Sequence, residues 1–241
     1  MENEEQPRMR NVLIAAPSYD GKVNVWHATA LNETSKIGLM RGINVSAVYM
    51  SYDALVQRAR NDIFKLAVDA QIDDLVFIDC DVDWQPADFF KLLEHDVHIV
   101  AAPIIKKSDL QHTYSIKMTG GYKVEDNGLA EVDGAATGMM RIRSDAIHKI
   151  WSYSEEYQEQ HKSEPSRMVF DVKLIDGELV SEDIVFCRKW IEMGGKVYID
   201  PTINCGHSGE KRWISNFNDW ISVNKKPENP IMRINVPTTK H

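Results

Sequence analysis

Four short apolar runs, each followed by enough residues for a helix, constrain the fold of this chain most. They lie at residues 12–16, 45–50, 75–78 and 99–102. Continuous apolar runs of this length are typical of strands buried on both faces, and strands that alternate with helices form parallel sheets. The first half of the chain therefore predicts an α/β fold with helices on both faces of a sheet.

Local signals mark the helices between these strands. From Asp53 onward apolar residues recur near a period of 3.6, which predicts an amphipathic helix with Asp53 as its N-cap. Pro86 is placed to open the next helix, where its missing N–H costs nothing. Before them, the polar stretch that ends near Arg41 is expected to contain a helix, although its apolar pattern is weak.

The second half of the chain is less regular and predicts a mixed arrangement. The expected strands are residues 113–116, 122–124, 139–142, 169–174 and 197–199. Asp176-Gly177 is a strong turn signal, and Ser181 can cap a helix over residues 182–193. With 241 residues and no linker in the middle, we expect one domain.

The net charge of −8, from 28 Lys and Arg against 36 Asp and Glu, argues against a dedicated nucleic-acid binder. Such proteins gain much of their affinity from cationic contacts to phosphates, although the total leaves room for a localised basic groove. The acidic N-terminus lacks the apolar core of a signal peptide, and no run approaches the ~20 apolar residues of a membrane helix. Cys80, Cys187 and Cys205 lack metal-ligand spacing and are expected as reduced thiols. We therefore expect a soluble, cytoplasmic protein.

The third apolar run leads directly into three acids, Asp79, Asp81 and Asp83. In open α/β sheets this is the end of the strand where ligands bind. Alternate spacing on an extended chain would put the three carboxylates on one side, where repulsion raises at least one pKa unless a cation lies among them. Mg²⁺ and Mn²⁺ prefer such oxygen ligands and can bridge to a substrate diphosphate.

Closely spaced acids also occur in calcium-binding loops and in phosphohydrolases. An EF-hand loop counted from Asp79 needs Gly at its sixth position and Glu at its twelfth, but Trp84 and Phe90 stand there. A Mg²⁺-dependent phosphohydrolase that forms an aspartyl-phosphate on Asp79 remains an alternative, although its acidic pair usually follows the first strand. No Gly-x-Gly-x-x-Gly or Walker pattern follows any predicted strand.

Several segments, taken in order, resemble the GT-A glycosyltransferases, specifically the soluble family-2-like enzymes. The matching segments are residues 58–61, 77–84, 134–143, 181–188 and 200–207. The resemblance implies a GT-A fold, with a central, mostly parallel mixed sheet flanked by helices in a single domain. We expect a disordered tail at 1–10, this domain at 11–212, and a C-terminal extension at 213–241 that packs on the surface or is partly disordered.

The resemblance implies transfer of a sugar from a nucleoside-diphosphate donor to an acceptor hydroxyl, with Mn²⁺ or Mg²⁺ as cofactor. Asp79 and Asp81 match the DxD motif, in which Asp81 would bind the ion and Asp79 would lie nearer the ribose. His207 would complete the metal site as a neutral imidazole, with an ordinary loop histidine as the alternative. Asp83 has no assignment by this analogy.

Glu182 and Asp183 match the acidic pair that supplies the catalytic base. A carboxylate at a helix N-terminus is held ionised by the backbone N–H groups and can accept the acceptor's proton. We expect Asp183 as the base with Glu182 orienting the acceptor, and a single displacement that inverts the anomeric configuration. The reverse assignment stays open, as does plain helix capping. A non-catalytic module that binds a nucleotide sugar is a further alternative.

The remaining expected donor contacts follow from the same analogy. They are Pro17, Tyr19, Asp20, Arg60, Asp79, Cys80 and Gly138. Tyr19 could stack on the base, with Trp26 as a rival, and Arg60 could reach the donor or instead pair with nearby acids. The acceptor could be a glycan, a lipid-linked sugar, a protein or a modified DNA base, of which the negative net charge favours DNA least. The oligomeric state is not readable from the sequence.

Overall fold

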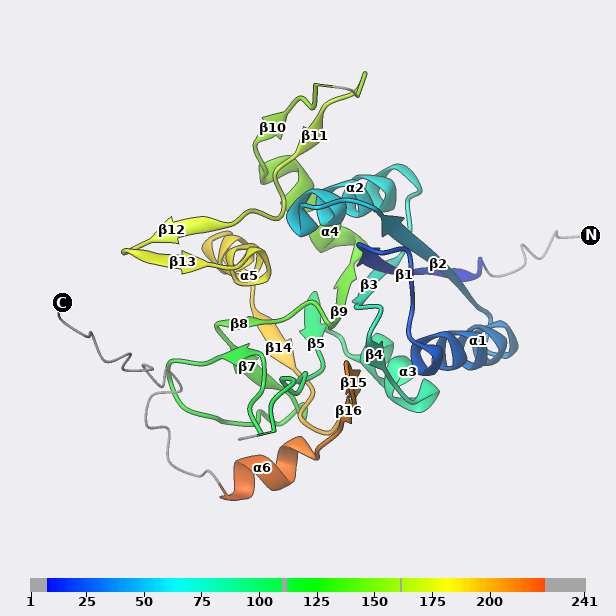
Figure 1. The fold of residues 1–241 in the computed structure, drawn as a ribbon, viewed down its shortest axis with the longest axis vertical. Helices are drawn as coiled ribbons and strands as arrows, with labels where there is room; N and C mark the ends of the chain where they lie inside the picture. The colour runs from blue at the N-terminus through cyan, green and yellow to red at the C-terminus, as the bar shows by residue number, and fades with distance from the viewer. Residues whose placement is uncertain (1–7, 110–111, 161, 224–241) are drawn as a thin grey trace, which may run out of the picture.

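A seven-stranded sheet forms the centre of the molecule (Figure 1). The computed structural model describes residues 8–109, 112–160 and 162–223. In spatial order the strands are β2 (Ile43–Ser51), β1 (Arg10–Ser18), β3 (Asp74–Ile78), β9 (Met139–Arg143), β5 (Ile99–Ala101), β14 (Val197–Ile199) and β7 (Ala130–Val132). The described helices are α1 (Val25–Met40), α2 (Val56–Asp69), α3 (Pro86–Glu94), α4 (Ser144–Tyr153), α5 (Glu182–Glu192) and α6 (Phe217–Val223). The predicted α/β class with a mixed sheet is confirmed.

Five strands of this sheet run in one direction, and β9 and β7 run in the other. β1 pairs parallel with both β2 and β3, and β14 pairs parallel with β5. β9 lies antiparallel between β3 and β5, and β7 closes the sheet antiparallel to β14. The strands are therefore mostly parallel in direction, as predicted, but β9 brings the second half of the chain into the middle of the sheet.

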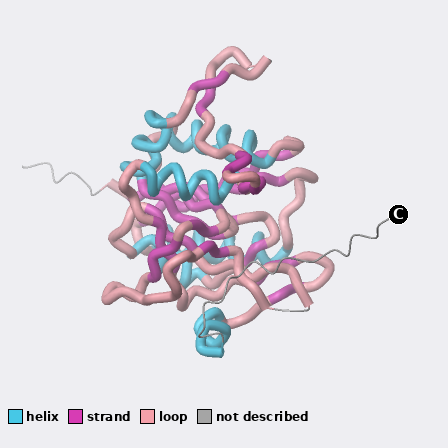
Figure 2. Tube along the Cα trace, turned by 90° about the vertical axis from the view of Figure 1, so that its left-hand side faces the viewer, coloured by secondary structure: helices cyan, strands magenta, loops and turns pink. Residues whose placement is uncertain are grey.

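Side chains alternate along β1 between two hydrophobic cores, one on each face of the sheet. Leu13 and Ala15 belong to the core that α2, α4 and α5 cover, while Val12 and Ile14 belong to the core under α1 and α3. Figure 2 shows the strands between helices on two sides. Because both faces are buried, these strands read as continuous apolar runs in the sequence.

Four small sheets complete the described fold. β4 (Val82–Asp83), β15 (Gly206–Ser208) and β16 (Arg212–Trp213) form one sheet in the order β16-β15-β4. The pairs are β12 (Lys173–Ile175) with β13 (Glu178–Val180), β10 (Glu156–Tyr157) with β11 (Ser166–Arg167), and β6 (Ile116–Lys117) with β8 (Gly134–Ala135). The β12–β13 hairpin turns at Asp176-Gly177, both with positive φ, as the sequence predicts.

The structure corrects three local predictions. Asp53 is not the N-cap of α2, because its carboxylate accepts the Leu55 N–H at 2.9 Å and holds Arg58, so that the helix begins after Leu55. Residues 122–124 form no strand beyond an isolated bridge at Val124. Residues 169–172 are irregular because the Asn61 side chain binds both the N–H and the carbonyl of Phe170, at 2.7 and 3.1 Å. A strand would need those backbone groups for its own ladder.

The ends of the described chain join the fold. β1 begins at Arg10, and Arg8 pairs with Asp73 at 3.2 Å. Near the other end Phe217 of α6 is buried, with its ring 4.7 Å from that of Tyr114. Residues 1–7 of the predicted tail and 224–241 of the predicted extension lie outside the described residues. No described helix is long and apolar enough to cross a membrane, and all three cysteines are free thiols.

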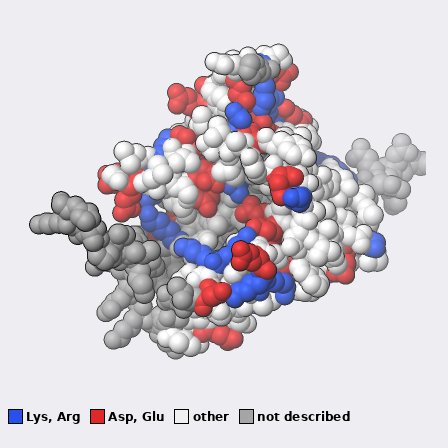
Figure 3. Space-filling model, viewed as in Figure 1, with Lys and Arg blue, Asp and Glu red and all other residues white. Residues whose placement is uncertain are grey.

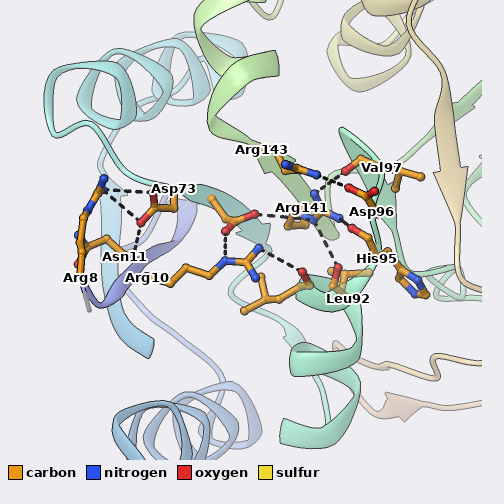
Figure 4. Close-up of polar contacts among 12 residues, drawn as sticks. Arg8, Arg10, Asn11, Asp73, Leu92, His95, Asp96, Val97, Arg141 and Arg143 are labelled. Carbon is orange, nitrogen blue, oxygen red and sulfur yellow. Dashed lines mark hydrogen bonds and ion pairs between the residues drawn. The ribbon is translucent and has the colours of Figure 1, made fainter. Parts of the chain in front are cut away.

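A fully buried arginine on β9 ties the end of α3 to the sheet (Figure 4). Arg141 donates to the carbonyls of Val97 at 2.6 Å and His95 at 2.7 Å, just beyond the helix. Asp74, also buried, lies 3.9 Å from Arg141 Nε and accepts from Arg10 Nε at 2.6 Å. Burial lowers the pKa of Arg141 to about 10, so the guanidinium remains charged at neutral pH.

We expect Arg141→Met to lower the free energy of unfolding by about 3–5 kcal/mol, because it leaves the carbonyls of His95 and Val97 without their buried donor and leaves Asp74 with Arg10 as its one cation. Arg143→Met is the matched control, since Arg143 lies on the same strand but pairs with Asp96, whose side chain is 99% exposed. That control should cost less than about 1 kcal/mol. Urea denaturation of both variants measures the difference, and equal losses would contradict a structural role for the buried charge.

Candidate active site

The three predicted acids follow β3, but the chain turns so that each meets a different cationic side chain. Asp79 pairs with Arg60 at 2.8 Å, Asp81 contacts Lys107, and Asp83 holds Arg212 at 2.6 and 3.0 Å. The Val82 N–H binds the Asp79 carbonyl at 2.9 Å, which closes a tight turn. Because the chain turns between Asp79 and Val82, the three acids do not lie along one extended segment as predicted, and each has a cationic side chain of the protein beside it.

Asp83 is a structural residue of the small sheet. It lies opposite Gly206 in the β4–β15 pairing, and Arg212 approaches its carboxylate with two N–H groups. A forked contact of this kind fixes both side chains. Asp83 thus joins the acidic turn to the β15–β16 hairpin, which carries His207.

Asp81 faces outward at the centre of the site. Burial raises the pKa of Asp81, but its contacts with His207 and Lys107 outweigh burial and lower that pKa to about 2. The sequence predicts a raised pKa only where no cation lies among the acids, and here cationic side chains of the protein lie beside them. Figure 3 shows acidic and basic side chains close together near the centre of this face.

His207 is oriented as a metal ligand would be. Its Nδ1 donates to the Ile105 carbonyl at 2.7 Å, which leaves the Nε2 lone pair 3.6 Å from Asp81 Oδ1. Two atoms with lone pairs that face each other at this separation favour a cation between them. A backbone carbonyl on the far nitrogen is the usual way that a ligating histidine is oriented.

The donor set therefore fits a divalent ion held by Asp81 and His207 and completed by substrate phosphate and water. Asp79, the third expected ligand, is turned toward Arg60. No group of three or more His, Cys, Asp or Glu side chains suited to a metal occurs among residues 8–109, 112–160 and 162–223. The imidazole favours Mn²⁺ over the harder Mg²⁺.

Arg60 joins the two predicted carboxylate motifs. It lies on α2 and is only 5% exposed. Its Nη2 donates to Asp79 Oδ1 at 2.8 Å, and its Nη1 donates to Glu182 Oε1. The sequence leaves two roles open for Arg60, contact with the donor and pairing with nearby acids. In the structure Arg60 pairs with nearby acids. The guanidinium places the end of β3 beside the start of α5.

Glu182 and Asp183 occupy the first turn of α5, as predicted, but they point to different partners. Glu182 is held by Arg60, whereas Asp183 Oδ1 accepts from the Ser181 hydroxyl and from the Ile184 N–H at 2.7 Å. Ser181 is the N-cap residue by position, although its side chain binds Asp183 rather than the helix backbone. Asp183 Oδ2 makes no hydrogen bond within the described part of the chain.

His27 organises the acidic turn, and sequence reasoning missed it. It is fully buried on α1, its Nδ1 lies 3.1 and 3.0 Å from the carbonyls of Asp79 and Val82, and its Nε2 lies 2.8 Å from the Tyr49 hydroxyl. Burial lowers the pKa of His27, which favours the neutral ring. A lone histidine in a weakly patterned helix gives no sequence signal. Trp84 fills the core beside it, at 5.0 Å between rings.

The expected donor residues at the end of β1 and just after it lie next to the acidic turn. The Cys80 thiol contacts the Pro17 carbonyl at 3.4 Å, and the Cys80 carbonyl accepts from the Asn24 N–H at 2.9 Å. Tyr19 is 71% exposed and is free to stack on a planar ligand, whereas Trp26 is 55% exposed and has the Arg212 guanidinium 5.9 Å from its ring centroid.

Asp20 and Gly138 border the same region in different ways. Asp20 pairs with Lys22 at 3.1 Å. The Gly138 carbonyl accepts from the Asp79 N–H at 3.1 Å, and a Cβ on Gly138 would lie 2.9 Å from Ile104 and 3.6 Å from Asp79 Oδ2. A side chain there would crowd the acidic turn, so glycine keeps this approach open.

A hollow of about 670 Å³ lies elsewhere, at the opposite end of the sheet. Its lining includes Arg8, Arg10, Asp73, Asp74 and Arg143. These groups are already paired with one another or with neighbouring acids. The chemistry gathers instead at the carboxyl ends of β1 and β3, where open α/β sheets bind ligands.

Comparison with known proteins supports the fold only. No protein-family model matches the chain, and no curated protein sequence matches it. The solved structure of A197 from STIV matches 87% of this chain and 91% of its own, at 16% identity and a TM-score of 0.53, so the two share a fold. A glycosyltransferase involved in the glycosylation of the major capsid of PBCV-1 matches 58% of this chain and 65% of its own, at 12% identity. Its TM-score of 0.33 is too low to support an argument.

We expect Arg60→Met to lower the free energy of unfolding by about 2–4 kcal/mol, because it leaves Asp79 and Glu182 facing each other without a cation. Arg58→Met is the control, since Arg58 lies on the same helix but is partly exposed and pairs with Asp53. Adding Asp79→Asn to Arg60→Met should recover part of the loss, by removing one unpaired charge. If Arg58→Met costs as much in urea denaturation, Arg60 has no special role.

Proposed function

We propose that the chain is a metal-dependent, inverting glycosyltransferase that uses a nucleoside-diphosphate sugar. The observation that carries the proposal is the Arg60 bridge, because it brings the acidic turn after β3 and the acidic pair of α5 into one site. The first motif is suited to a donor diphosphate with its ion, and the second to an acceptor hydroxyl. The fold shared with A197 from STIV is compatible with this function and does not specify it.

The donor would lie across the carboxyl ends of β1 and β3. Asp81 and His207 would hold the ion, and the base would stack on Tyr19 or Trp26 beside Pro17 and Asp20. Asp79, fixed by Arg60, would face the ribose. The backbone of Cys80 and Gly138 would lie close to the donor beside it. When bound, the ion supplies positive charge against the departing diphosphate.

Asp183 is the better candidate for the base, and Glu182 for the group that orients the acceptor. Glu182 is already held by Arg60, whereas Asp183 Oδ2 makes no hydrogen bond among the described residues and so is free to meet an acceptor hydroxyl. In the reaction the acceptor oxygen bonds to the anomeric carbon and gives its proton to Asp183. The bond from that carbon to the diphosphate oxygen breaks, and its electron pair leaves with the nucleoside diphosphate.

Donor binding is tested by thermal unfolding against a panel of nucleoside diphosphates, with and without Mn²⁺. At a hundred times its Kd a ligand adds about 2.7 kcal/mol, which corresponds to roughly 5–10 °C for a chain of this size. We expect one diphosphate to give such a shift only with Mn²⁺, and Asp81→Asn to abolish it. The control Asp96→Asn removes an exposed acid far from the site and should keep the shift.

A response to Mg²⁺ with phosphate mimics, without any response to nucleotides, would contradict the transferase proposal. Hydrolysis of an aryl phosphate that is lost in Asp79→Asn would then support the phosphohydrolase alternative.

The roles of the acidic pair are tested by two conservative substitutions in a transfer assay. We expect Asp183→Asn to retain donor binding and to lower the transfer rate by about 10²–10⁴, the range typical of acid–base groups. Glu182→Gln should have the smaller effect on the rate. The opposite ranking would reverse the two roles, and full turnover in both variants would leave the chain as a binding module. NMR coupling constants of the product report whether the anomeric configuration inverts.

A further inference from the structure

Asp81, the best candidate for holding the ion, is already paired with a lysine. Lys107 Nζ contacts Asp81 Oδ2, while His207 Nε2 faces Oδ1 of the same carboxylate. Lys107 lies in the loop after β5 and belongs to none of the motifs that the sequence analysis selects. Since an ammonium group and a divalent ion on one carboxylate repel each other, the ion must compete with Lys107.

The backbone around Lys107 is fixed to the rest of the site. The Ile105 carbonyl accepts from His207 Nδ1 at 2.7 Å, and the Lys106 N–H binds the Thr113 carbonyl at 2.8 Å. The Ser208 N–H binds the Asp81 carbonyl at 2.7 Å, which ties the histidine strand to the acidic turn. These bonds hold the base of the lysine, whereas its four-carbon stem can swing and keep the ammonium group within reach of the site.

The lysine stem lies in a gap that a glycine leaves open. A Cβ on Gly209 would approach Lys107 Cδ to 3.2 Å, tighter than an ordinary van der Waals contact. The side chain of Lys107 is about one-third exposed, so its ammonium group can reach a ligand without unfolding of the loop.

The neighbouring cations have other partners. Arg212 is held by Asp83 through two hydrogen bonds, and Lys211 contacts Asp109. Arg60 is buried between Asp79 and Glu182. Among these four cations, Lys107 is the one paired with the candidate metal ligand. Lysine is also a common phosphate ligand, as a point charge on a flexible stem.

We propose that Lys107 is a diphosphate-binding residue that neutralises Asp81 in the free protein and transfers to the donor diphosphate when the divalent ion takes its place. This inference rests on the proposed function and adds a positioning residue to it. Lys107 then opposes binding of the ion alone and favours binding of the ion together with a diphosphate. A lysine with a purely structural role would not act with opposite signs on these two equilibria.

The first test measures the affinity for Mn²⁺ alone, from the electron paramagnetic resonance signal of free Mn²⁺. We expect Lys107→Met to bind Mn²⁺ roughly fivefold more tightly than the wild type, about what the loss of one competing exposed ion pair provides. Lys107→Arg keeps the charge and should stay within about twofold of the wild type. Lys196→Met is the matched control, because Lys196 forms an exposed ion pair with Glu131 instead of Asp81.

The second test measures the affinity for inorganic pyrophosphate by calorimetry, at a saturating and matched concentration of free Mn²⁺. Lys107→Met should bind pyrophosphate about tenfold more weakly than the wild type, since it lacks one charge-assisted contact. Lys196→Met should bind it as the wild type does. Thermal unfolding of each variant without ligand verifies that the fold is intact.

The outcomes separate this inference from the proposed function. Unchanged Mn²⁺ affinity or unchanged pyrophosphate affinity in Lys107→Met overturns the exchange. This holds even if Asp81→Asn abolishes Mn²⁺ binding, a result that would support the metal site alone. Equal Mn²⁺ binding in the wild type and Asp81→Asn overturns the metal site itself, and the exchange with it. Tighter Mn²⁺ together with weaker pyrophosphate in Lys107→Met supports the exchange.

Discussion

The arrangement of the candidate site depends on one buried guanidinium, that of Arg60. A charge removed from water must be neutralised by well-placed partners, and here the partners are Asp79 at the end of β3 and Glu182 at the start of α5. Arg60 and Glu182 are 122 positions apart in the sequence. The three groups therefore lock α2, β3 and α5 into one relative position. The same contact that satisfies a buried charge also assembles the two halves of the site.

The sheet topology makes this contact possible. β9 enters antiparallel between β3 and β5, and the loop that precedes it places Gly138 against the backbone of Asp79. Arg141 on the same strand anchors the end of α3 through backbone carbonyls. One strand from the second half of the chain thus supports the acidic turn on one side and holds a helix of the first half on the other.

The acidic turn is neutralised by the protein itself, with one cation for each carboxylate. In an open cluster of acids, by contrast, a metal ion would have to supply the neutralising charge. Arg60 makes a bridging contact and Arg212 a forked contact, so the carboxylates of Asp79 and Asp83 are held in fixed positions. Asp81, whose cation is a flexible lysine, is the acid that can change partners. The turn therefore contains two acids that are held by arginines with further fixed contacts and one acid that is held by a flexible lysine.

The sequence by itself determined the strands and the chemical character of the site. Both faces of β1, β3, β5 and β14 are buried, so their continuous apolar runs predict strands. Short motifs in the sequence select the acids of the site, Asp79, Asp81, Glu182 and Asp183. The sequence predicted strands at residues 122–124 and 169–172 where the structure has none, and at 169–172 the Asn61 side chain, which is distant in sequence, binds the backbone groups that a strand would use. Only the tertiary structure decided that Arg60 joins the two acidic motifs and that His27 holds the acidic turn. It also decided that Asp83 pairs with Arg212 and that Lys107 pairs with Asp81. Each of these depends on long-range packing, and a single charged or polar residue carries no periodic signal that identifies its partner.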